Sequence, residues 1–141
     1  MAMTIRVDIV GAEGAIHSGS ATMVYATAEM GEVGIAPRHT AFISRLKPGD
    51  VRVETENGEQ EHFYISGGLL EVQPSVVTVL ADTAVRAHDL DEAAALEAKR
   101  RAEDALAGHT AEFEYAKAQT ELAEAVAQLR AIEKLRKIKR G

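Results

Sequence analysis

Residues 51–65 read VRVETENGEQEHFYI, and this pattern predicts a β-hairpin. Apolar residues alternate with polar ones on both sides of an Asn-Gly pair: Val51, Val53, Phe63 and Ile65. A period of two residues is typical of a half-buried strand. Asn57-Gly58 is a strong hairpin signal, because both residue types tolerate the positive φ that a tight turn requires.

The same kind of pattern extends over residues 4–81, where short apolar runs are broken by turn signals. A second hairpin is predicted around Gln73-Pro74-Ser75, with apolar runs before and after it. Further turns are expected at 31–34 and at 47–49, which contain glycine or proline. Many short strands at close spacing favour an antiparallel sandwich or a flattened barrel, and no helix of useful length is expected before Ala87.

The composition changes near Arg86, and the rest of the chain predicts a helical hairpin. From Asp89 onward glycine occurs only at Gly108 and Gly141 and proline is absent, so strong helix formers follow one another without interruption. We expect Asp89 to cap the first helix, with Glu92 returning the capping interaction. Gly108 is the expected end of this helix.

A second helix is expected to begin at Thr110, which can cap it, and to run toward Ile138. Because the connection is short, the two helices should lie antiparallel. The apolar face predicted for the first helix consists of Leu90, Ala93, Leu96 and Leu106. The face predicted for the second consists of Leu122, Val126, Leu129, Ile132 and Leu135. The predicted domains are a β-domain at 1–86 and an α-helical hairpin at 87–141.

Charge is polarised along the predicted hairpin. Acidic residues dominate its body, whereas its last turns are basic: Arg130, Lys134, Arg136, Lys137, Lys139 and Arg140. Basic groups compensate the dipole at the C-terminus of a helix, but these six exceed what that role needs. A binding role for this basic end therefore stands beside the simpler interpretation, in which the charges only solubilise and cap the helix.

No group of residues predicts catalysis or a metal site. The chain has no cysteine, and its five histidines show neither the i, i+4 spacing of a helical metal pair nor a His-Glu-x-x-His run. Ser66-Gly67-Gly68 is not followed by the helix and Lys-Ser or Lys-Thr pair of a phosphate-binding loop. We expect the two glycines to allow a bend or bulge between strands.

The bulk composition excludes two further classes of function. The net charge of −6 argues against nucleic acid as the main partner, since phosphate binding needs a basic surface. The opening MAMTIRVDIV lacks the layout of a signal peptide, and no apolar run approaches the ~20 residues that span a bilayer. Any membrane association is expected to come through another protein.

Four runs of the sequence resemble, in order, the signature runs of one family: Gly31-Glu-Val-Gly-Ile-Ala-Pro-Arg-His39, Leu46-Lys-Pro-Gly-Asp-Val-Arg-Val53, Ile65-Ser-Gly-Gly-Leu-Leu-Glu-Val-Gln-Pro74 and Val79-Leu-Ala-Asp-Thr-Ala84. The alanine-rich runs at 91–102 and 122–130 match as well. The family is the epsilon subunit of bacterial rotary F-type ATP synthases, and the likeness covers almost the whole chain.

The resemblance implies a ten-stranded antiparallel β-sandwich followed by a two-helix hairpin. It also implies a non-catalytic place in the central rotor stalk, between the gamma subunit and the ring of c subunits, on the cytoplasmic face of the bacterial inner membrane. The family's ring-facing tip matches residues 29–39, with Glu29, Glu32 and His39 as contact residues. Arg38 stands where the family usually has glycine.

The family also implies a role for the hairpin, which either folds compactly or extends into the catalytic alpha/beta head and inhibits ATP hydrolysis. Acidic segments of the beta subunits would then suit the basic residues of the second helix: Arg130, Lys134, Arg136 and Lys137. Some members bind ATP at the start of the first helix, but Ala94 replaces the arginine of that motif. Asp91 and Arg101 remain as candidates for weak ATP binding, and no other cofactor is expected.

An alanine-rich face buries little apolar area, so the hairpin is expected to depend on what it docks against. We therefore expect compact and extended forms of residues 89–141 to interconvert. Two other classes of function stay open at this stage. One is a free-standing adaptor module whose hairpin pairs with some other coiled coil, and the other is an enzyme, for which the sequence shows no converging set of polar residues.

Overall fold

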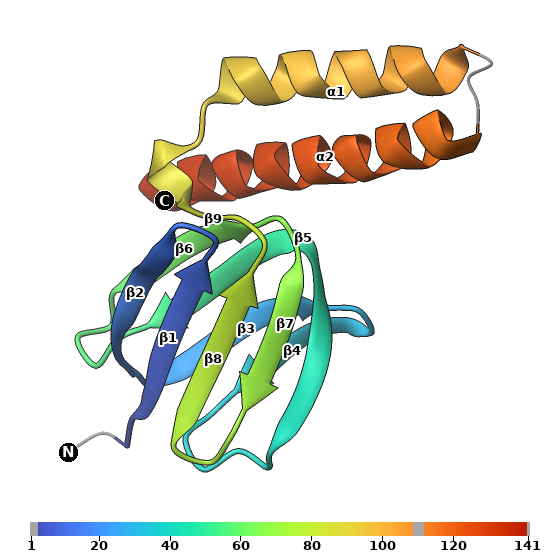
Figure 1. Cartoon of the computed structure of the whole chain (residues 1–141). Coiled ribbons are helices and arrows are strands. Elements are labelled where there is room, and N and C mark those ends of the chain that lie inside the picture. Colours follow the sequence, from blue (N-terminus) through green and yellow to red (C-terminus); the bar gives the residue numbers. More distant parts are fainter. Residues whose placement is uncertain (1–2, 109–111, 141) are drawn as a thin grey trace.

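A β-sandwich forms the N-terminal part of the chain, and two helices lie across one end of it (Figure 1). The computed structural model describes residues 3–108 and 112–140. Within them, nine strands form: β1 (Ile5–Gly11), β2 (Gly14–Ala21), β3 (Met23–Ala28), β4 (Gly31–Ile35), β5 (Phe42–Glu54), β6 (Gln60–Ile65), β7 (Gly68–Val72), β8 (Val76–Ala81) and β9 (Ala84–Arg86). The helical part comprises the 3₁₀ turn η1 (Ala87–Asp89) and the helices α1 (Glu92–Ala107) and α2 (Glu112–Arg140).

Strand β5 belongs to both layers of the sandwich. Its residues 42–46 pair with β7, whereas residues 49–54 pair with β6. One layer therefore runs β2-β1-β8-β7-β5 and the other runs β4-β3-β5-β6-β9. Counted as two strands, β5 brings the total to the ten that the family resemblance implies.

The turn predicted at 47–49 is wrong, because these residues lie within β5 at its passage from one layer to the other. Gly49 is needed there: a Cβ at this position would come within 2.7 Å of the Thr27 hydroxyl oxygen on the neighbouring strand. The Pro-Gly pair thus marks a bend in a continuous strand, as glycine and proline do where strands change direction.

The pairing is antiparallel, as expected, with the exception of β1 and β8, which are parallel. These two strands lie far apart in the sequence, so no tight turn joins them and imposes an antiparallel arrangement. The predicted hairpin at Asn57-Gly58 is confirmed: Gly58 has a φ of 78°, and the Thr55 N–H donates to the Glu59 carbonyl oxygen at 2.9 Å.

The core lies between the layers and consists of the inward-facing members of each alternating run. Ile5, Val7 and Ile9 of β1 are buried, and so are Val51 and Val53 of β5. The large side chains Phe63, Ile65, Leu70 and Val72 of β6 and β7 belong to the same core. Burial of one face of each strand fixes the register, because a slip by one residue would turn this apolar face toward water.

The bend expected at Gly67-Gly68 is confirmed. Their φ values of 132° and 138° are rarely adopted by other residues. Space adds a second reason at Gly68, where a Cβ would lie 2.1 Å from the Leu80 carbonyl oxygen. The two glycines therefore let β7 approach β8 closely as the chain leaves β6.

The first helix is capped by Asp91. The cap predicted from the sequence, Asp89, is therefore wrong. Leu90 is extended, so Asp89 closes the 3₁₀ turn η1, and the Asp91 carboxylate accepts the Ala94 N–H at 3.2 Å. The predicted end at Gly108 is confirmed by its N–H, which donates to the Asp104 carbonyl oxygen. The predicted cap Thr110 lies outside the described residues.

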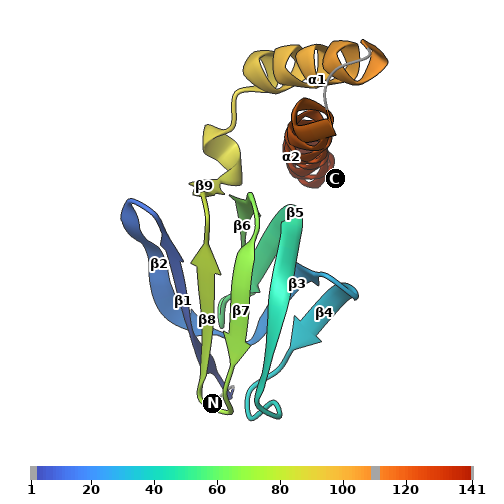
Figure 2. The ribbon, with the colours of Figure 1, turned by 45° about the vertical axis from the view of Figure 1, so that its right-hand side comes forward.

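The two helices lie antiparallel, as predicted, and α2 lies between α1 and the sandwich (Figure 2). The predicted apolar faces are correct in part, because the five residues predicted for the second helix are half-buried, whereas Ala93 of the first is exposed. Among the described residues, the fully buried members of the hairpin are alanines: Ala95, Ala102, Ala118, Ala125, Ala127 and Ala131. Leu96, by contrast, is 51% exposed. Small side chains allow close approach of α2 to neighbours on both sides, and the larger residues lie at the margins. No helix of the described residues is long and apolar enough to cross a membrane.

Candidate interaction surfaces

The β3–β4 hairpin ends in a tight turn at Glu29 and Met30. Gly31, with a φ of 126°, closes this turn and starts β4, so the turn predicted at 31–34 lies two residues too late. Glu29 and Glu32 are exposed, and Met30 is 96% exposed. The protruding tip therefore combines two carboxylates with an uncovered apolar side chain.

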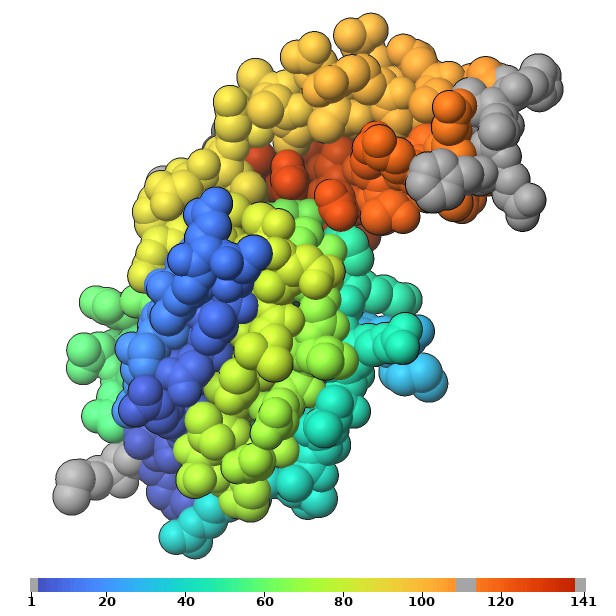
Figure 3. Space-filling view, in the orientation of Figure 1, coloured from blue at the N-terminus to red at the C-terminus, as the bar shows by residue number. Residues whose placement is uncertain are grey.

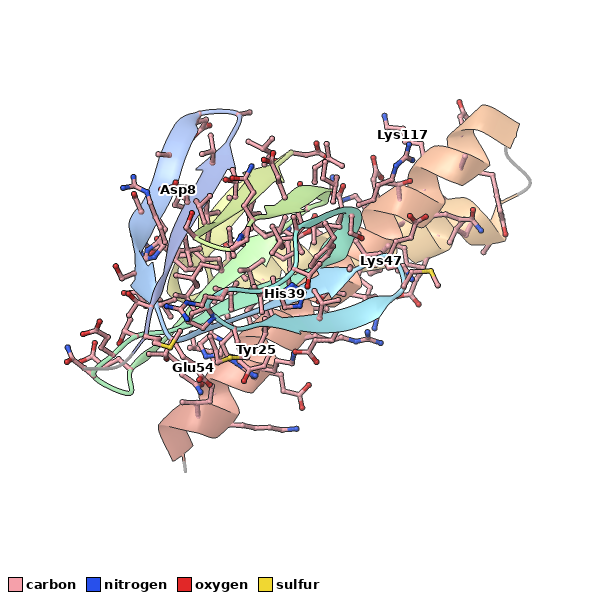
Figure 4. The ribbon with its side chains drawn as sticks, turned by 90° about the horizontal axis from the view of Figure 1, so that it is seen from below. Asp8, Tyr25, His39, Lys47, Glu54 and Lys117 are labelled. Atoms are coloured by element: carbon pink, nitrogen blue, oxygen red, sulfur yellow. The ribbon has the colours of Figure 1, made fainter. Side chains whose placement is uncertain are left out.

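His39 does not lie at this tip. Strand β4 is extended over five residues, which separates its ends by about 13–16 Å. Beyond it, the Arg38 N–H donates to the Pro74 carbonyl oxygen at 2.9 Å, which places the loop that carries His39 beside the β7–β8 turn. Figure 4 looks onto this end of the sandwich and labels His39. Its Nδ1 lies 2.8 Å from the Thr40 carbonyl oxygen, and its ring packs against Phe42.

Arg38 adopts a φ of 66° and is the only non-glycine residue with positive φ in the described part of the chain. This left-handed conformation favours glycine, which carries no Cβ to clash with the backbone. The glycine usual in the family at this position is thus explained by the backbone conformation. Arg38 retains the same turn at a conformational cost.

The hairpin docks on the sandwich through α2. The buried Tyr64 hydroxyl donates a hydrogen bond to the Glu124 carbonyl oxygen at 3.3 Å. Burial, and secondarily the Glu124 carboxylate, raise the pKa of Tyr64 to about 12. Burial and the nearby Glu121 and Asp82 carboxylates also raise the pKa of Glu124. Ala127 and Ala131 line a groove against Pro48 and Gly49 of β5 in the same interface.

A second polar contact holds α2 to the same face of the sandwich. The Lys134 ammonium lies 3.1 Å from the Asp50 Oδ1 atom. The other oxygen of Asp50 lies 4.0 Å from Nδ1 of His62 on β6. Burial lowers the pKa of His62, against the attraction of Asp50 for a proton on the ring. One carboxylate thus faces a histidine of the sandwich and a lysine of the helix.

The four basic residues predicted as the inhibitory end of α2 are not used alike. Lys134 pairs with the sandwich, and Arg136 pairs with Glu92 at the start of α1. Lys137 pairs only with Glu133 one turn earlier on its own helix. Arg130 is exposed and forms no ion pair within the described residues. Two of the four cations therefore hold the compact form of the hairpin together.

The two weak nucleotide candidates do not form one site. Asp91 caps α1, and Arg101 lies ten residues further on, about 15 Å along the helix. Arg101 lines a groove of about 260 Å³ between the helices together with Glu121 and Glu124. Two carboxylates repel a phosphate group, so this groove is poorly suited to bind one. No cluster of potential metal ligands occurs among the described residues.

An apolar stripe crosses the outer face of the β8-β7-β5 layer and was not predicted from the sequence. Leu69 pairs directly with Leu80, and Ile43 lies diagonally across from Leu69. These three side chains are 43%, 45% and 71% exposed. The helices leave this face uncovered (Figure 3). The adjacent pair Leu69-Leu70 could have indicated this stripe from the sequence. Successive side chains of a strand point to opposite faces, so one of the two leucines must point outward.

Comparison with known proteins covers both parts of the chain. Residues 4–87 match the family model "ATP synthase, Delta/Epsilon chain, beta-sandwich domain", and residues 88–133 match "ATP synthase, Delta/Epsilon chain, long alpha-helix domain". The chain is 64% identical over 137 residues to the ATP synthase epsilon chain of Nitrosococcus oceani. It is 67% identical over 138 residues to that of Thioalkalivibrio sulfidiphilus. Each alignment covers 97% of this chain and 98% of the relative.

Two solved assemblies contain chains of the same fold. One is the mitochondrial ATP synthase of Euglena gracilis, with a TM-score of 0.83 and 21% identity, covering 92% of this chain and 81% of the other. The second is the central stalk and c-ring of the Tetrahymena thermophila mitochondrial ATP synthase, with a TM-score of 0.64 and 12% identity. That match covers 92% of this chain and 97% of the other.

Proposed function

The chain belongs to the ATP synthase delta/epsilon chain family, and from this premise we propose that it works as the central-stalk subunit of a bacterial F-type ATP synthase. In this role the sandwich is the fixed part of the rotor, and the helical hairpin is a movable arm that restrains ATP hydrolysis. Family membership over the whole length favours this role over the free-standing adaptor.

Two surfaces of the sandwich suit the partners that the family resemblance implies. The uncovered stripe of Ile43, Leu69 and Leu80 would bury apolar area against the gamma subunit, at about 25 cal/mol per Å² removed from water. The acidic tip with Glu29 and Glu32 would face the polar loops of the c-ring. His39 lies at the other end of β4, so it would belong to a different contact from the two glutamates.

One observation carries the proposal that the hairpin moves: two of the four cations suited to an acidic partner are paired with other elements of the chain in the compact form. Lys134 binds Asp50, and Arg136 binds Glu92. The rest of the interface consists mainly of alanines, with the half-buried Leu135 and the Tyr64 hydroxyl hydrogen bond, and these contacts stabilise docking by only a few kcal/mol. A difference of this size lets a partner select the extended form.

The movable arm can be tested by locking it. The chain has no cysteine, so cysteines introduced at Pro48 and Ala127, which line one groove, form the only pair. Oxidation of this pair in the assembled enzyme should raise ATP hydrolysis, and reduction should restore the inhibition. Each single-cysteine variant is the matched control and should show no response to oxidant. Unchanged hydrolysis in the oxidised double variant would contradict the proposal.

The subunit is proposed to act without catalysis, on the cytoplasmic side of the membrane, and to reach the membrane only through its partners. Any ATP binding would be weak, because Asp91 and Arg101 are separated and Ala94 supplies no guanidinium. Calorimetric titration of the full chain with ATP tests this expectation. Saturable binding in the micromolar range would contradict it.

A further inference from the structure

Three ionisable side chains from three elements meet beneath the C-terminal half of α2. Asp50 comes from β5, His62 from β6 and Lys134 from α2. The Lys134 Nζ atom lies 3.1 Å from one oxygen of Asp50, and the His62 Nδ1 atom lies 4.0 Å from the other. The side chains of Asp50 and His62 are only 13% and 7% exposed, so these two groups are largely shielded from water, whereas Lys134 is 51% exposed.

The docked helix disfavours a positive charge on His62. Within the described residues its Nε2 atom is buried without a hydrogen-bond partner, so a second ring proton would have no acceptor there. Lys134 already neutralises Asp50, and the guanidinium of Arg52 on β5 adds a second positive charge. Gln60, Glu61, Arg86, His88 and Leu135 line the adjoining cavity. Burial, Arg52 and Lys134 together outweigh Asp50, and the pKa of His62 is lowered.

Departure of α2 reverses these conditions. Lys134 and Leu135 leave with the helix, so His62 gains contact with water and Asp50 loses its lysine. A protonated His62 can then pair with the free Asp50 carboxylate without competition. The undocked sandwich consequently binds a proton at His62 more tightly than the docked one.

We propose that His62 is a proton-sensitive release for the hairpin, which shares Asp50 with Lys134 so that protonation of the imidazole undocks α2. This inference rests on the proposed function, in which the undocked hairpin is the inhibitory form. Acidification would therefore favour the form of the subunit that blocks ATP hydrolysis.

The direction of the pH effect follows from linkage. The pKa of His62 is lower when α2 is docked, so the contribution of this site to docking is fully present above the pKa of the undocked form. It is lost as the pH falls from the pKa of the undocked form toward the lower pKa of the docked form. Between the two pKa values, each pH unit lowers the ratio of docked to undocked chain by up to about tenfold.

The full chain is tested with two fluorophores on cysteines introduced at the exposed positions Glu56 and Lys117, one in the sandwich and one in α2. Energy transfer should fall between about pH 7.5 and pH 5.5 as the hairpin undocks. Two variants remove the titrating group, His62→Gln and His62→Phe, and each should abolish this transition. A transition of the same size and midpoint in both variants, or constant transfer in the unsubstituted chain, overturns the proposal.

A second measurement keeps the test independent of how the variants fold. The titration of His62 is followed by NMR in the chain that carries the Pro48 and Ala127 cysteines, before and after reduction. The pKa of His62 should be lower in the oxidised, locked chain than in the reduced chain. Lys134→Gln should raise the pKa of His62 in the locked chain, because Asp50 loses its competing partner. Equal His62 titration in locked and reduced chains overturns the proposal.

The same variants in the assembled enzyme separate this inference from the proposed function. If His62 is not the proton-sensitive release but the proposed function is right, locking still relieves inhibition, while His62→Gln leaves the pH dependence of hydrolysis unchanged. If the function itself is wrong, locking at Pro48 and Ala127 has no effect on hydrolysis at any pH. If acid-induced inhibition is lost in His62→Gln but kept in the unsubstituted enzyme, the result supports His62 as the proton-sensitive release.

Discussion

The hydroxyl of Tyr64 on β6 donates a hydrogen bond to the carbonyl oxygen of Glu124 in α2, across a separation of 60 residues. This contact joins the sandwich to the movable helix near the middle of α2. The side chain of Tyr64 is almost completely buried, so its hydroxyl depends on the docked helix for a partner. Its chemistry therefore reports whether the hairpin is docked.

Alkaline pH should undock the hairpin through Tyr64. Its pKa is raised to about 12 in the docked form, against about 10 for an exposed tyrosine. A raised pKa means that the neutral hydroxyl stabilises docking below pH 10, and that this contribution is lost as the pH rises from about 10 to 12. Energy transfer between labels at Glu56 and Lys117 should fall over that range.

The control for this titration is Tyr64→Phe, which has no proton to lose and should show no transition of this origin. The variant also removes a hydrogen bond worth about 0.5–1.5 kcal/mol, so its docked population at neutral pH should be about 2- to 12-fold lower relative to the undocked one. An unchanged alkaline transition in Tyr64→Phe would assign the effect to other groups.

Replacement of Arg38 by glycine should stabilise the sandwich. Glycine adopts the φ of 66° without the cost of about 1 kcal/mol that a Cβ imposes. The N–H that donates to Pro74 is retained in Arg38→Gly. Thermal unfolding should show a midpoint a few degrees higher. Arg38→Ala keeps the Cβ and is the matched control, and an equal gain in both variants would refute the conformational explanation.

Gly68→Ala should destabilise the sandwich by at least about 2 kcal/mol, because the new Cβ meets the Leu80 carbonyl oxygen in a backbone conformation that alanine rarely adopts. Gly58→Ala is the matched control: its φ of 78° is also positive, but nothing lies within 4 Å of the added Cβ. This control should lose only about 1 kcal/mol. Chemical denaturation measures both, and equal losses would show that the close approach is unimportant.

The basic end of α2 is tested by charge reversal in two pairs. Arg130→Glu with Lys137→Glu changes cations that form no ion pair with the sandwich or with α1 within the described residues, so it should disturb docking less than the second pair does. Hydrolysis by the assembled enzyme should rise if these residues bind acidic partner surfaces. The rise should be smaller at high salt, because exposed charges are screened over about 10 Å at 0.1 M. Unchanged hydrolysis would favour the simpler role in solubility and capping.

The second pair, Lys134→Glu with Arg136→Glu, removes the contacts to Asp50 and Glu92 as well. In the isolated chain it should lower the docked population more than the first pair does. Comparison of the two pairs by energy transfer separates the intramolecular use of these cations from their use toward partners. Equal docking in both pairs would show that the ion pairs contribute little.

Local signals in the sequence were sufficient for several elements of this chain, although they misplaced the turns predicted at 31–34 and 47–49 and the cap of α1. The Asn57-Gly58 turn and the glycines before β7 depend on the backbone preferences of a few adjacent residues. The alternation in β1 and β5 identified the buried faces of the strands, because a strand exposes alternate residues to opposite sides. For these features the neighbours in sequence are also the neighbours in space.

Only the tertiary structure decided which residues of the helices and of the sandwich contact one another. A thin face rich in alanine was expected for α1, but close packing of α2 between α1 and the sandwich also makes Ala125 and Ala131 the buried residues of α2. Nothing near Lys134 in the sequence indicates that its partner is Asp50, 84 residues away, or that His62 shares it. Charge and hydrophobicity are properties of a residue, whereas burial and pairing depend on the surface that the fold brings against it.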